Sequence, residues 1–291
     1  MEYNYCPPKI IAEVGCNHKG DLEIAKNLID IAKSCNVDIV KFQKRNNKEL
    51  LSKAQYDSPH PEPSNSYGAT YGEHREFLEF DIKQHRELKK YTEDLGLIYS
   101  SSVWDTTSAK EIISINPIFI KVPSACNNNF DMLRVLRDEY DGDVHISFGM
   151  TSRQEEQDIF NFFNQKDQSK RLVLYACTSG YPVDFQDVCM LEIVRIYKEF
   201  SDRVKSVGFS GHHLGIAVDV AAYTLGACFI ERHFTLDRTW KGTDHSASLE
   251  PTGLRKLVRD LKATYQTLTY KKNDILPIEV EQRNKLKYRN E

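Results

Sequence analysis

Short β-forming runs alternate with amphipathic segments eight times along the 291 residues, and this alternation constrains the fold more than any other feature. The first run is KIIAEVG at 9–15, and the helix predicted behind Asp21 places Ile24, Leu28 and Ala32 on one face. The other strands are predicted at 38–43, 97–102, 119–124, 143–149, 171–179, 206–211 and 227–234. Alternating strands and helices predict a parallel sheet, and eight such units predict a closed (β/α)8 barrel.

The main alternative to the barrel is a doubly wound sheet that binds a nucleotide. No GxGxxG follows a predicted strand and no Walker A sequence occurs, so this fold gains no support from motifs. We therefore predict one barrel domain over 1–270 and a charged, lightly packed tail over 271–291. The polar stretch at 44–80 is long for a connection, which predicts a functional loop.

Composition excludes several classes of function. The net charge of −3 argues against general nucleic-acid binding, and no apolar run approaches the ~20 residues that span a bilayer. The N-terminus has neither a basic region nor an apolar core of the kind found in signal peptides. Seven scattered cysteines without a CxxC pair predict reduced thiols in a cytoplasmic protein.

Polar residues gather at the predicted carboxyl ends of the strands, where barrels of this type place their sites. They are Glu13, Lys41, Gln43, Ser101, Lys121, Ser124, Thr178, Ser179, Ser210, His212, Glu231 and His233. A single lysine at a strand end is usually solvated, and a single buried histidine usually belongs to the core. Two lysines, two glutamates and two histidines at one end are harder to explain in that way, because buried charges need partners.

The residue types indicate a chemistry. Two neutral imidazoles, His212 and His233, can hold a divalent transition metal that activates a carbonyl as a Lewis acid. Lys41 and Lys121, with several hydroxyl groups, suit a phosphate and a carboxylate. A metal ion with free coordination positions beside an anion-binding pocket favours carbon–carbon bond formation between an enol phosphate and an aldehyde.

Seven stretches between Ile11 and Pro251 resemble the N-acetylneuraminate synthase (sialic acid synthase) family. They are IAEVGCNHKGDLEIAKNLID, DIVKFQ, FIKVPSACNNN, SFGMTS, YACTSGYP, VGFSGHH and IERHFTLDRTWKGTDHSASLEP. The resemblance implies a (β/α)8 barrel transferase that needs Mn²⁺ or Mg²⁺. It also implies the condensation of phosphoenolpyruvate with an aldose, such as an N-acylated hexosamine, to a nonulosonic or similar 3-deoxy-2-ulosonic acid with release of phosphate.

The resemblance also implies roles for individual residues. His212 and His233 resemble the metal ligands, and His213 ranks behind them because it points to the other side of its strand. The catalytic set it implies is Glu13, Lys41, Lys121 and Glu231. The phosphoenolpyruvate pocket would include Ser101, Ser124, Ser179 and Ser210, and the sugar contacts would be Gln43, Tyr181 and Asp244.

Three departures from the family pattern bear on the acceptor. Cys126 stands where the family has an acid that contacts the acyl-amino sugar, so N-acetylmannosamine is in doubt, and Gly211 stands where an Asp is usual. In relatives, an antifreeze-like C-terminal domain gives the sugar an arginine across a dimer. Here that domain would come from another chain, be replaced by 44–80, or be unnecessary. Arg45, His74 and Arg75 are replacement candidates, and a homodimer remains possible.

Two other functions compete with the synthase interpretation. One is a metal-dependent aldolase on the same barrel that uses pyruvate. The other is a non-catalytic carbohydrate-binding relative, which the altered acid and the missing domain would explain. An enzyme is favoured, because an inactive site has little reason to keep the full polar set. That set is Glu13, Lys41, Lys121, His212, Glu231 and His233.

Overall fold

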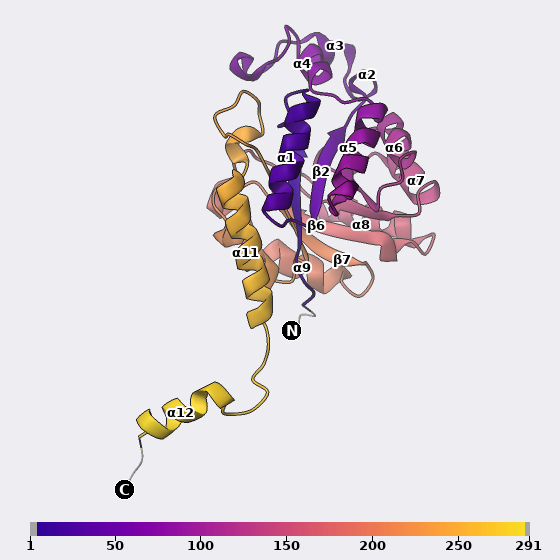
Figure 1. Cartoon of the computed structure of the whole chain (residues 1–291). Coiled ribbons are helices and arrows are strands. Elements are labelled where there is room, and N and C mark those ends of the chain that lie inside the picture. Colours follow the sequence, from indigo (N-terminus) through magenta and orange to yellow (C-terminus); the bar gives the residue numbers. More distant parts are fainter. Residues whose placement is uncertain (1–4, 289–291) are drawn as a thin grey trace.

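A computed structural model describes residues 5–288 and shows a closed barrel of eight parallel strands (Figure 1). Each strand pairs with its neighbours in the chain, and β1 pairs with β8. The (β/α)8 prediction is confirmed, and the doubly wound alternative is wrong because an open sheet would leave β1 and β8 unpaired. The strands are β1 (Lys9–Gly15), β2 (Ile39–Lys44), β3 (Ile98–Val103), β4 (Phe119–Val122), β5 (Asp143–Ser147), β6 (Leu172–Cys177), β7 (Ser206–Gly211) and β8 (Phe229–His233).

Helices connect the strands and cover the outside of the barrel. They are α1 (Leu22–Ser34), α5 (Ile82–Asp94), α6 (Thr106–Ile113), α7 (Phe130–Asp138), α8 (Arg153–Asn164), α9 (Leu191–Phe200), α10 (Ala217–Thr224) and α11 (Pro251–Thr267). Asp21 caps α1 by accepting hydrogen bonds from the backbone N–H groups of Glu23 and Ile24. Of the predicted inner face of α1, Leu28 and Ala32 are buried, whereas Ile24 is only partly buried.

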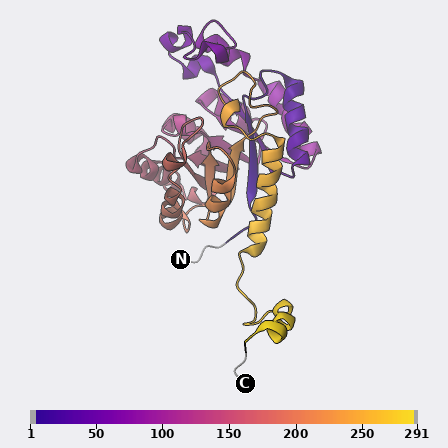
Figure 2. The same ribbon diagram turned by 90° about the vertical axis from the view of Figure 1, so that its left-hand side faces the viewer.

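The predicted loop at 44–80 folds into short helices at the end of the barrel where the strands finish (Figures 1 and 2). These helices are α2 (Asn47–Leu50), α3 (Lys53–Asp57) and α4 (Tyr71–Phe77). Ser52 and Thr70 begin α3 and α4 with capping boxes. The insertion therefore has a defined structure over the barrel mouth, where it can contribute side chains to a site.

The opposite end of the barrel carries a feature that the sequence did not predict. Cys6, just before β1, forms a disulfide with Cys228, just before β8. The expectation of reduced thiols throughout is wrong for this pair, although Cys16, Cys35, Cys126, Cys177 and Cys189 are free. The disulfide fastens the chain near the seam where the last strand meets the first.

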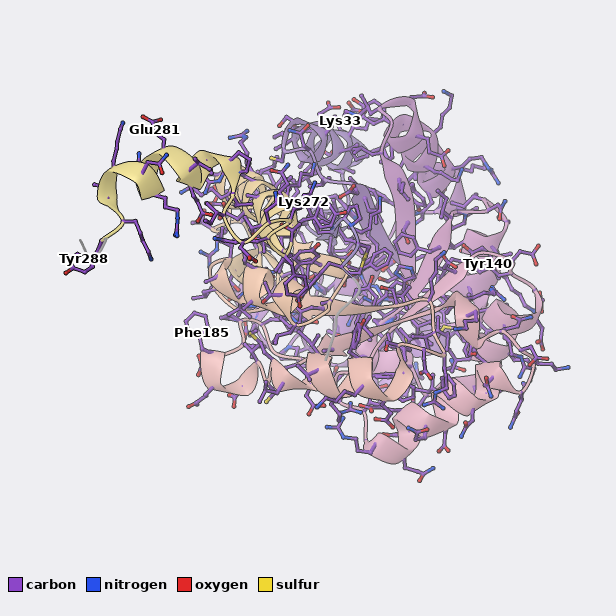
Figure 3. All side chains as sticks on the ribbon, turned by 90° about the horizontal axis from the view of Figure 1, so that it is seen from below. Lys33, Tyr140, Phe185, Lys272, Glu281 and Tyr288 are labelled. Atoms are coloured by element: carbon purple, nitrogen blue, oxygen red, sulfur yellow. A yellow bond between two sulfur atoms is a disulfide. The ribbon has the colours of Figure 1, made fainter. Side chains whose placement is uncertain are left out.

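The chain after α11 leaves the barrel. The helix α12 (Pro277–Leu286) buries none of its residues and stands apart from the barrel in both views (Figures 1 and 2). Seen from below, Glu281 and Tyr288 project beyond the barrel wall (Figure 3). Within 5–288, no helix is both long enough and apolar enough to cross a bilayer.

Candidate active site

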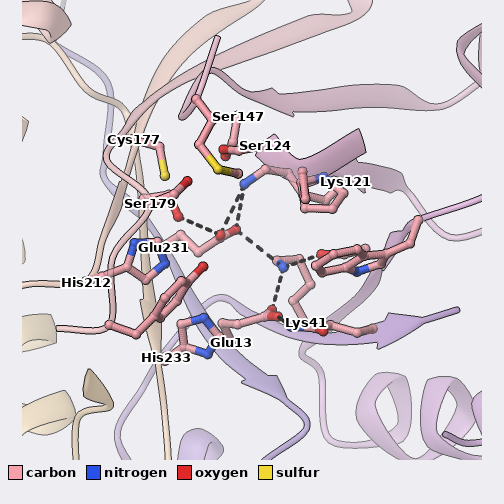
Figure 4. Close-up of a pocket in the computed structure, with 18 of the residues that line it drawn as sticks. Glu13, Lys41, Lys121, Ser124, Ser147, Cys177, Ser179, His212, Glu231 and His233 are labelled. Carbon is pink, nitrogen blue, oxygen red and sulfur yellow. Dashed lines mark hydrogen bonds and ion pairs between the residues drawn. The ribbon is translucent and has the colours of Figure 1, made fainter. Parts of the chain in front are cut away.

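A cavity of about 370 Å³ opens at the carboxyl ends of the strands (Figure 4). It brings together every predicted site residue except Ser101, Thr178 and Asp244. Those that line it are Glu13, Lys41, Gln43, Lys121, Ser124, Ser179, Tyr181, Ser210, His212, Glu231 and His233. They come from strands on all sides of the barrel, as convergence at a barrel mouth requires.

Two buried lysines and two buried glutamates form the floor of the cavity. The Nζ atom of Lys41 lies 2.5 Å from Oε2 of Glu13 and 3.7 Å from Oε2 of Glu231. The Nζ atom of Lys121 lies 3.1 Å from both carboxylate oxygens of Glu231. Ser210 donates a hydrogen bond of 3.0 Å to Glu231. The four charges balance one another, which is how this barrel can bury them.

The two lysines have different electrostatic environments. Burial acts to lower the pKa of Lys41, but Glu13 and Glu231 outweigh it, so this pKa is raised above its ordinary value. Burial lowers the pKa of Lys121 below its ordinary value, although Glu231 opposes the shift. Burial would raise the pKa of Glu231, yet Lys121 and Lys41 hold it below its usual range. The floor therefore presents fixed ammonium groups beside ionised carboxylate.

Ser102, not Ser101, faces the cavity from β3. Its Oγ atom accepts a hydrogen bond of 2.7 Å from Lys41, whereas Ser101 is fully buried outside the cavity. The placement of Ser101 was therefore wrong by one residue. Because successive side chains of a strand point to opposite sides, a difference of one position moves the hydroxyl from the inside to the outside.

Two further serines converge because a glycine lies between them. Gly149 follows β5, and a Cβ atom there would lie 2.5 Å from Oγ of Ser179 and 2.7 Å from Oγ of Ser124. The backbone N–H of Gly149 also donates a hydrogen bond of 3.0 Å to Ser124. The glycine thus leaves room for two hydroxyl groups on the side of the cavity next to Lys121, where an anion would need donors (Figure 4).

The rings of His212 and His233 lie side by side, with centroids 5.5 Å apart. Burial, then His233, lowers the pKa of His212 to about 3, so its imidazole is neutral. Its Nδ1 atom lies 3.1 Å from the carbonyl oxygen of Thr178, which can fix the tautomer and leave Nε2 with a lone pair. The Nδ1 atom of His233 is buried with no hydrogen-bond partner among residues 5–288. These two imidazoles could supply two ligands to a divalent metal, but residues 5–288 contain no group of three or more His, Cys, Asp or Glu side chains placed to hold one.

The backbone at Gly15 leaves the space that the His233 ring occupies. Gly15 has a φ of +56° at an irregularity in the β1–β2 pairing, a conformation that favours glycine. A Cβ atom on Gly15 would lie 3.0 Å from Nε2 of Gln43 and 3.3 Å from Cε1 of His233. Gly15 therefore lets Gln43 and His233 approach the same part of the mouth.

His213 follows β7 by two residues and does not line the cavity. Its Nε2 atom is 3.1 Å from Nη1 of Arg232 and 3.3 Å from Oδ2 of Asp219, and all three side chains are buried. The cluster sits between the barrel wall and α10, which carries Asp219. Arg232 lies between Glu231 and His233 on β8. Its side chain packs in this cluster and does not line the cavity.

A second cavity of about 240 Å³ adjoins the first beneath the insertion. It contains Asp244, and it shares Gln43, Arg75, Trp104, Tyr181 and His233 with the main cavity. Asp244 therefore lies near His233, but outside the main cavity. Burial acts to raise the pKa of Asp244, while His233 and Arg45 lower it below its ordinary value.

Two donors at the junction of the cavities lack partners. Within residues 5–288, Nη1 of Arg75 and Nε1 of Trp104 are buried and make no hydrogen bond. The other nitrogens of the Arg75 guanidinium contact the hydroxyl of Tyr71. Of the other replacement candidates, Arg45 is paired with Glu79 at 2.5 Å, and His74 is neutral because burial lowers its pKa to about 4. Trp104 follows β3 directly, and its apolar ring gave no signal of a site in the sequence.

The cysteine that replaces the expected acid is not a metal ligand in this arrangement. Cys126 is buried behind the cavity, with Sγ 3.6 Å from the carbonyl oxygen of Val103, and burial raises the pKa of its thiol. Its neighbour Ala125 lines the cavity instead. The side chain packs as a small apolar group.

Comparisons with known proteins agree with the fold. The model described as NeuB family matches residues 28–273. N-acetylneuraminate-9-phosphate synthase of Homo sapiens is 38% identical over 98% of this chain and 80% of its own length. N,N'-diacetyllegionaminic acid synthase of Legionella pneumophila is 34% identical over 87% of this chain and 71% of its own. The crystal structure of N-acetylneuraminic acid synthetase from Leptospira borgpetersenii in complex with citrate superposes with a TM-score of 0.81 at 27% identity, covering 98% and 94% of the two chains.

Proposed function

The chain belongs to the NeuB family, and from this premise we propose that it condenses phosphoenolpyruvate with an aldose to a 3-deoxy-2-ulosonic acid and releases phosphate. The observation that carries the proposal is the placement of two buried lysines beside two neighbouring imidazoles in one cavity. Ammonium groups suit the phosphate and carboxylate of the donor, and imidazoles suit a metal at the acceptor aldehyde.

The donor would occupy the floor of the cavity. Its anionic groups would contact Lys41 and Lys121, and the hydroxyls of Ser124 and Ser179 stand beside Lys121 as further donors. Holding the donor at a fixed distance from the acceptor supports catalysis by positioning, which can contribute ~7–11 kcal/mol. Glu231 supports this arrangement by fixing Lys121 before the substrate arrives.

A divalent ion, Mn²⁺ or Mg²⁺, held by His212 and His233 would supply Lewis-acid activation of the aldehyde. In the reaction, C3 of phosphoenolpyruvate bonds to the aldehyde carbon, water adds at C2, and phosphate leaves with cleavage of its C–O bond. Glu13 lies beside Lys41 and Gln43, where it can stabilise the cationic C2 centre or take the proton of the attacking water. We propose that this activity takes place in the cytoplasm.

The acceptor, in our proposal, is an aldose with a phosphate at the end remote from its aldehyde. The unpartnered donors Arg75 and Trp104 support this, because they lie at the junction of the main cavity with the adjoining one. Arginine is well suited to a phosphate, which it can bind through two parallel hydrogen bonds. The human relative named above forms a product that carries a 9-phosphate.

A phosphate-release assay tests the function. With Mn²⁺ and phosphoenolpyruvate, we expect release that requires an aldose, taken from a panel of N-acylated hexosamines, diamino sugars and their phosphorylated forms. A chelator should stop the reaction. If pyruvate replaces phosphoenolpyruvate, the protein is an aldolase. If a sugar binds and no combination releases phosphate, it is a carbohydrate-binding relative.

A further inference from the structure

The ammonium of Lys121 rests on an aromatic ring. Its Nζ atom lies 3.7 Å from the centroid of the Tyr175 ring, which comes from β6. Tyr175 is fully buried and belongs to the cluster that fills the barrel below the cavity, with Ile11, Ile39, Phe119 and Val173. A cation over an aromatic face is attracted by the ring quadrupole, most strongly where water is excluded.

The orientation of this ring is fixed by two neighbours. The Tyr175 hydroxyl lies 2.8 Å from Nδ1 of His145, and His145 in turn stacks on Phe119 with centroids 3.9 Å apart. On the other side, a Cβ atom on Gly208 would lie only 2.5 Å from the Tyr175 ring. Gly208 thus provides the space that the ring fills, and His145 holds its outer end.

The charges around Lys121 show why an aromatic face matters there. Burial is the largest influence on the pKa of Lys121 and lowers it, and Lys41 lowers it further. Glu231 acts in the opposite direction. Burial keeps Tyr175 and His145 neutral, because it raises the tyrosine pKa and lowers the histidine pKa. The ring therefore favours the charged form of Lys121 without adding a charge of its own.

We propose that Tyr175 is a positioning residue, whose ring face holds the Lys121 ammonium in place and in its charged form beneath the phosphoenolpyruvate pocket. His145 and Gly208 fix the ring in this role. The inference rests on the proposed function, in which Lys121 binds the donor. It adds a residue that does not touch the donor but sets the strength with which Lys121 can bind it.

The test weakens the attraction between the aromatic face and the Lys121 ammonium while keeping a six-membered aromatic ring at position 175. Position 175 is occupied in turn by phenylalanine (Tyr175→Phe), difluorophenylalanine and trifluorophenylalanine, and phosphoenolpyruvate binding is measured by calorimetry with Mn²⁺ present. We expect the trifluoro ring to bind phosphoenolpyruvate about tenfold more weakly than Tyr175→Phe, which is the reference because every ring of the series lacks the hydroxyl that contacts His145. A weaker face lowers the pKa of Lys121, so the alkaline loss of affinity should begin at lower pH.

The matched control is Tyr99 on β3. It is also buried, its hydroxyl lies 2.7 Å from Nδ1 of His85, and no cation lies over its ring within the described part of the chain. The same series at Tyr99 should leave phosphoenolpyruvate affinity and its pH profile unchanged, which separates the role of the ring face from a general effect on folding. Equal affinity across the Tyr175 series, or an equal loss in the Tyr99 series, would overturn the inference. An unaltered protein that fails to bind phosphoenolpyruvate would instead overturn the proposed function on which it rests.

Discussion

Lys121 on β4 and Glu231 on β8 form an ion pair across the barrel, with Nζ 3.1 Å from both carboxylate oxygens. The two strands are on opposite sides of the closed sheet. Burying such a pair costs several kcal/mol of desolvation per ion. The pair therefore contributes little net free energy to the stability of the fold. Its effect is to hold an ammonium group ready where a donor anion would bind.

Replacing Glu231 with Gln tests this account. Glu231→Gln leaves two buried ammonium groups with one carboxylate, so we expect the free energy of unfolding to fall by about 3 kcal/mol. Phosphoenolpyruvate should restore part of that loss, because its negative charges replace the missing carboxylate. Urea unfolding with and without phosphoenolpyruvate measures both effects.

The control is Glu192→Gln on α9. Glu192 contacts Arg153 and Arg195 at the surface, where ion pairs contribute about 0–1 kcal/mol. This variant should therefore show a small loss, and phosphoenolpyruvate should stabilise it only as much as it stabilises the unaltered protein. A Glu231→Gln protein as stable as the unaltered one without ligand would contradict the account.

The barrel could be predicted because its pattern is local. Each strand is a short apolar run and each helix carries one apolar face, so sequence spacing alone indicates eight units. Side-chain direction at the strand ends is less secure. The prediction held for Lys41 and Gln43 on β2, but on β3 the inward serine is Ser102 rather than Ser101. Strand pairing fixes that register, and pairing depends on contacts that are distant in the sequence.

Features that join remote segments could not be predicted in the same way. Cys6 and Cys228 are 222 residues apart, and they meet because closure of the barrel brings the starts of β1 and β8 together. Trp104 and Arg75 reach the site from segments outside the strands, where no periodic pattern points to a cavity. Arg75 was one of three candidates in a long polar stretch, and only the folded insertion distinguishes it from Arg45.

The two-histidine arrangement predicts how metal binding responds to mutation. In His233→Ala, Mn²⁺ affinity measured by calorimetry should fall by more than about 100-fold, beyond the loss expected from an outer-sphere partner. Turnover should be lost as well. In His213→Ala, Mn²⁺ binding should persist, because His213 faces Arg232 and Asp219 instead. That variant should lose about 1–3 kcal/mol of stability, since a buried polar cluster loses a partner. Equal Mn²⁺ affinity in the two variants would show that the ligand assignment is wrong.

Buried histidines predict an acid-sensitive fold. Burial is the main reason that the pKa values of His18 and His85 are lowered to about 3 in the folded protein. The unfolded chain takes up these protons near the ordinary value of about 6.5, whereas the folded chain takes them up only near 3. Stability is therefore full above pH ~6.5 and falls as the pH drops towards 3, by about 1.4 kcal/mol per pH unit for each histidine.

Urea unfolding at pH 6 and pH 5 checks this expectation, because ordinary carboxylates remain largely ionised in that window. His85→Gln removes one of the buried histidines that titrate in this way. It should lower the stability at pH 7 through loss of the bond to Tyr99, but its stability should fall less steeply with acid than that of the unaltered protein. An equal slope in the two proteins would show that His85 is already charged in the fold.

The unpartnered guanidinium nitrogen of Arg75 leads us to expect a preference for a phosphorylated acceptor. Its unpartnered Nη1 lies at the junction of the two cavities, so Arg75→Gln should raise the KM for a phosphorylated aldose by about 10–100-fold. The KM for phosphoenolpyruvate should change little, because that site is built on Lys41 and Lys121. Arg75→Lys should recover part of the loss, since it keeps the charge and loses the paired geometry. Arg86→Gln, on the exposed side of α5, serves as the control for removing a surface charge. A KM that rises equally for phosphorylated and unphosphorylated aldoses would show that Arg75 supports the cavity wall and does not bind the phosphate.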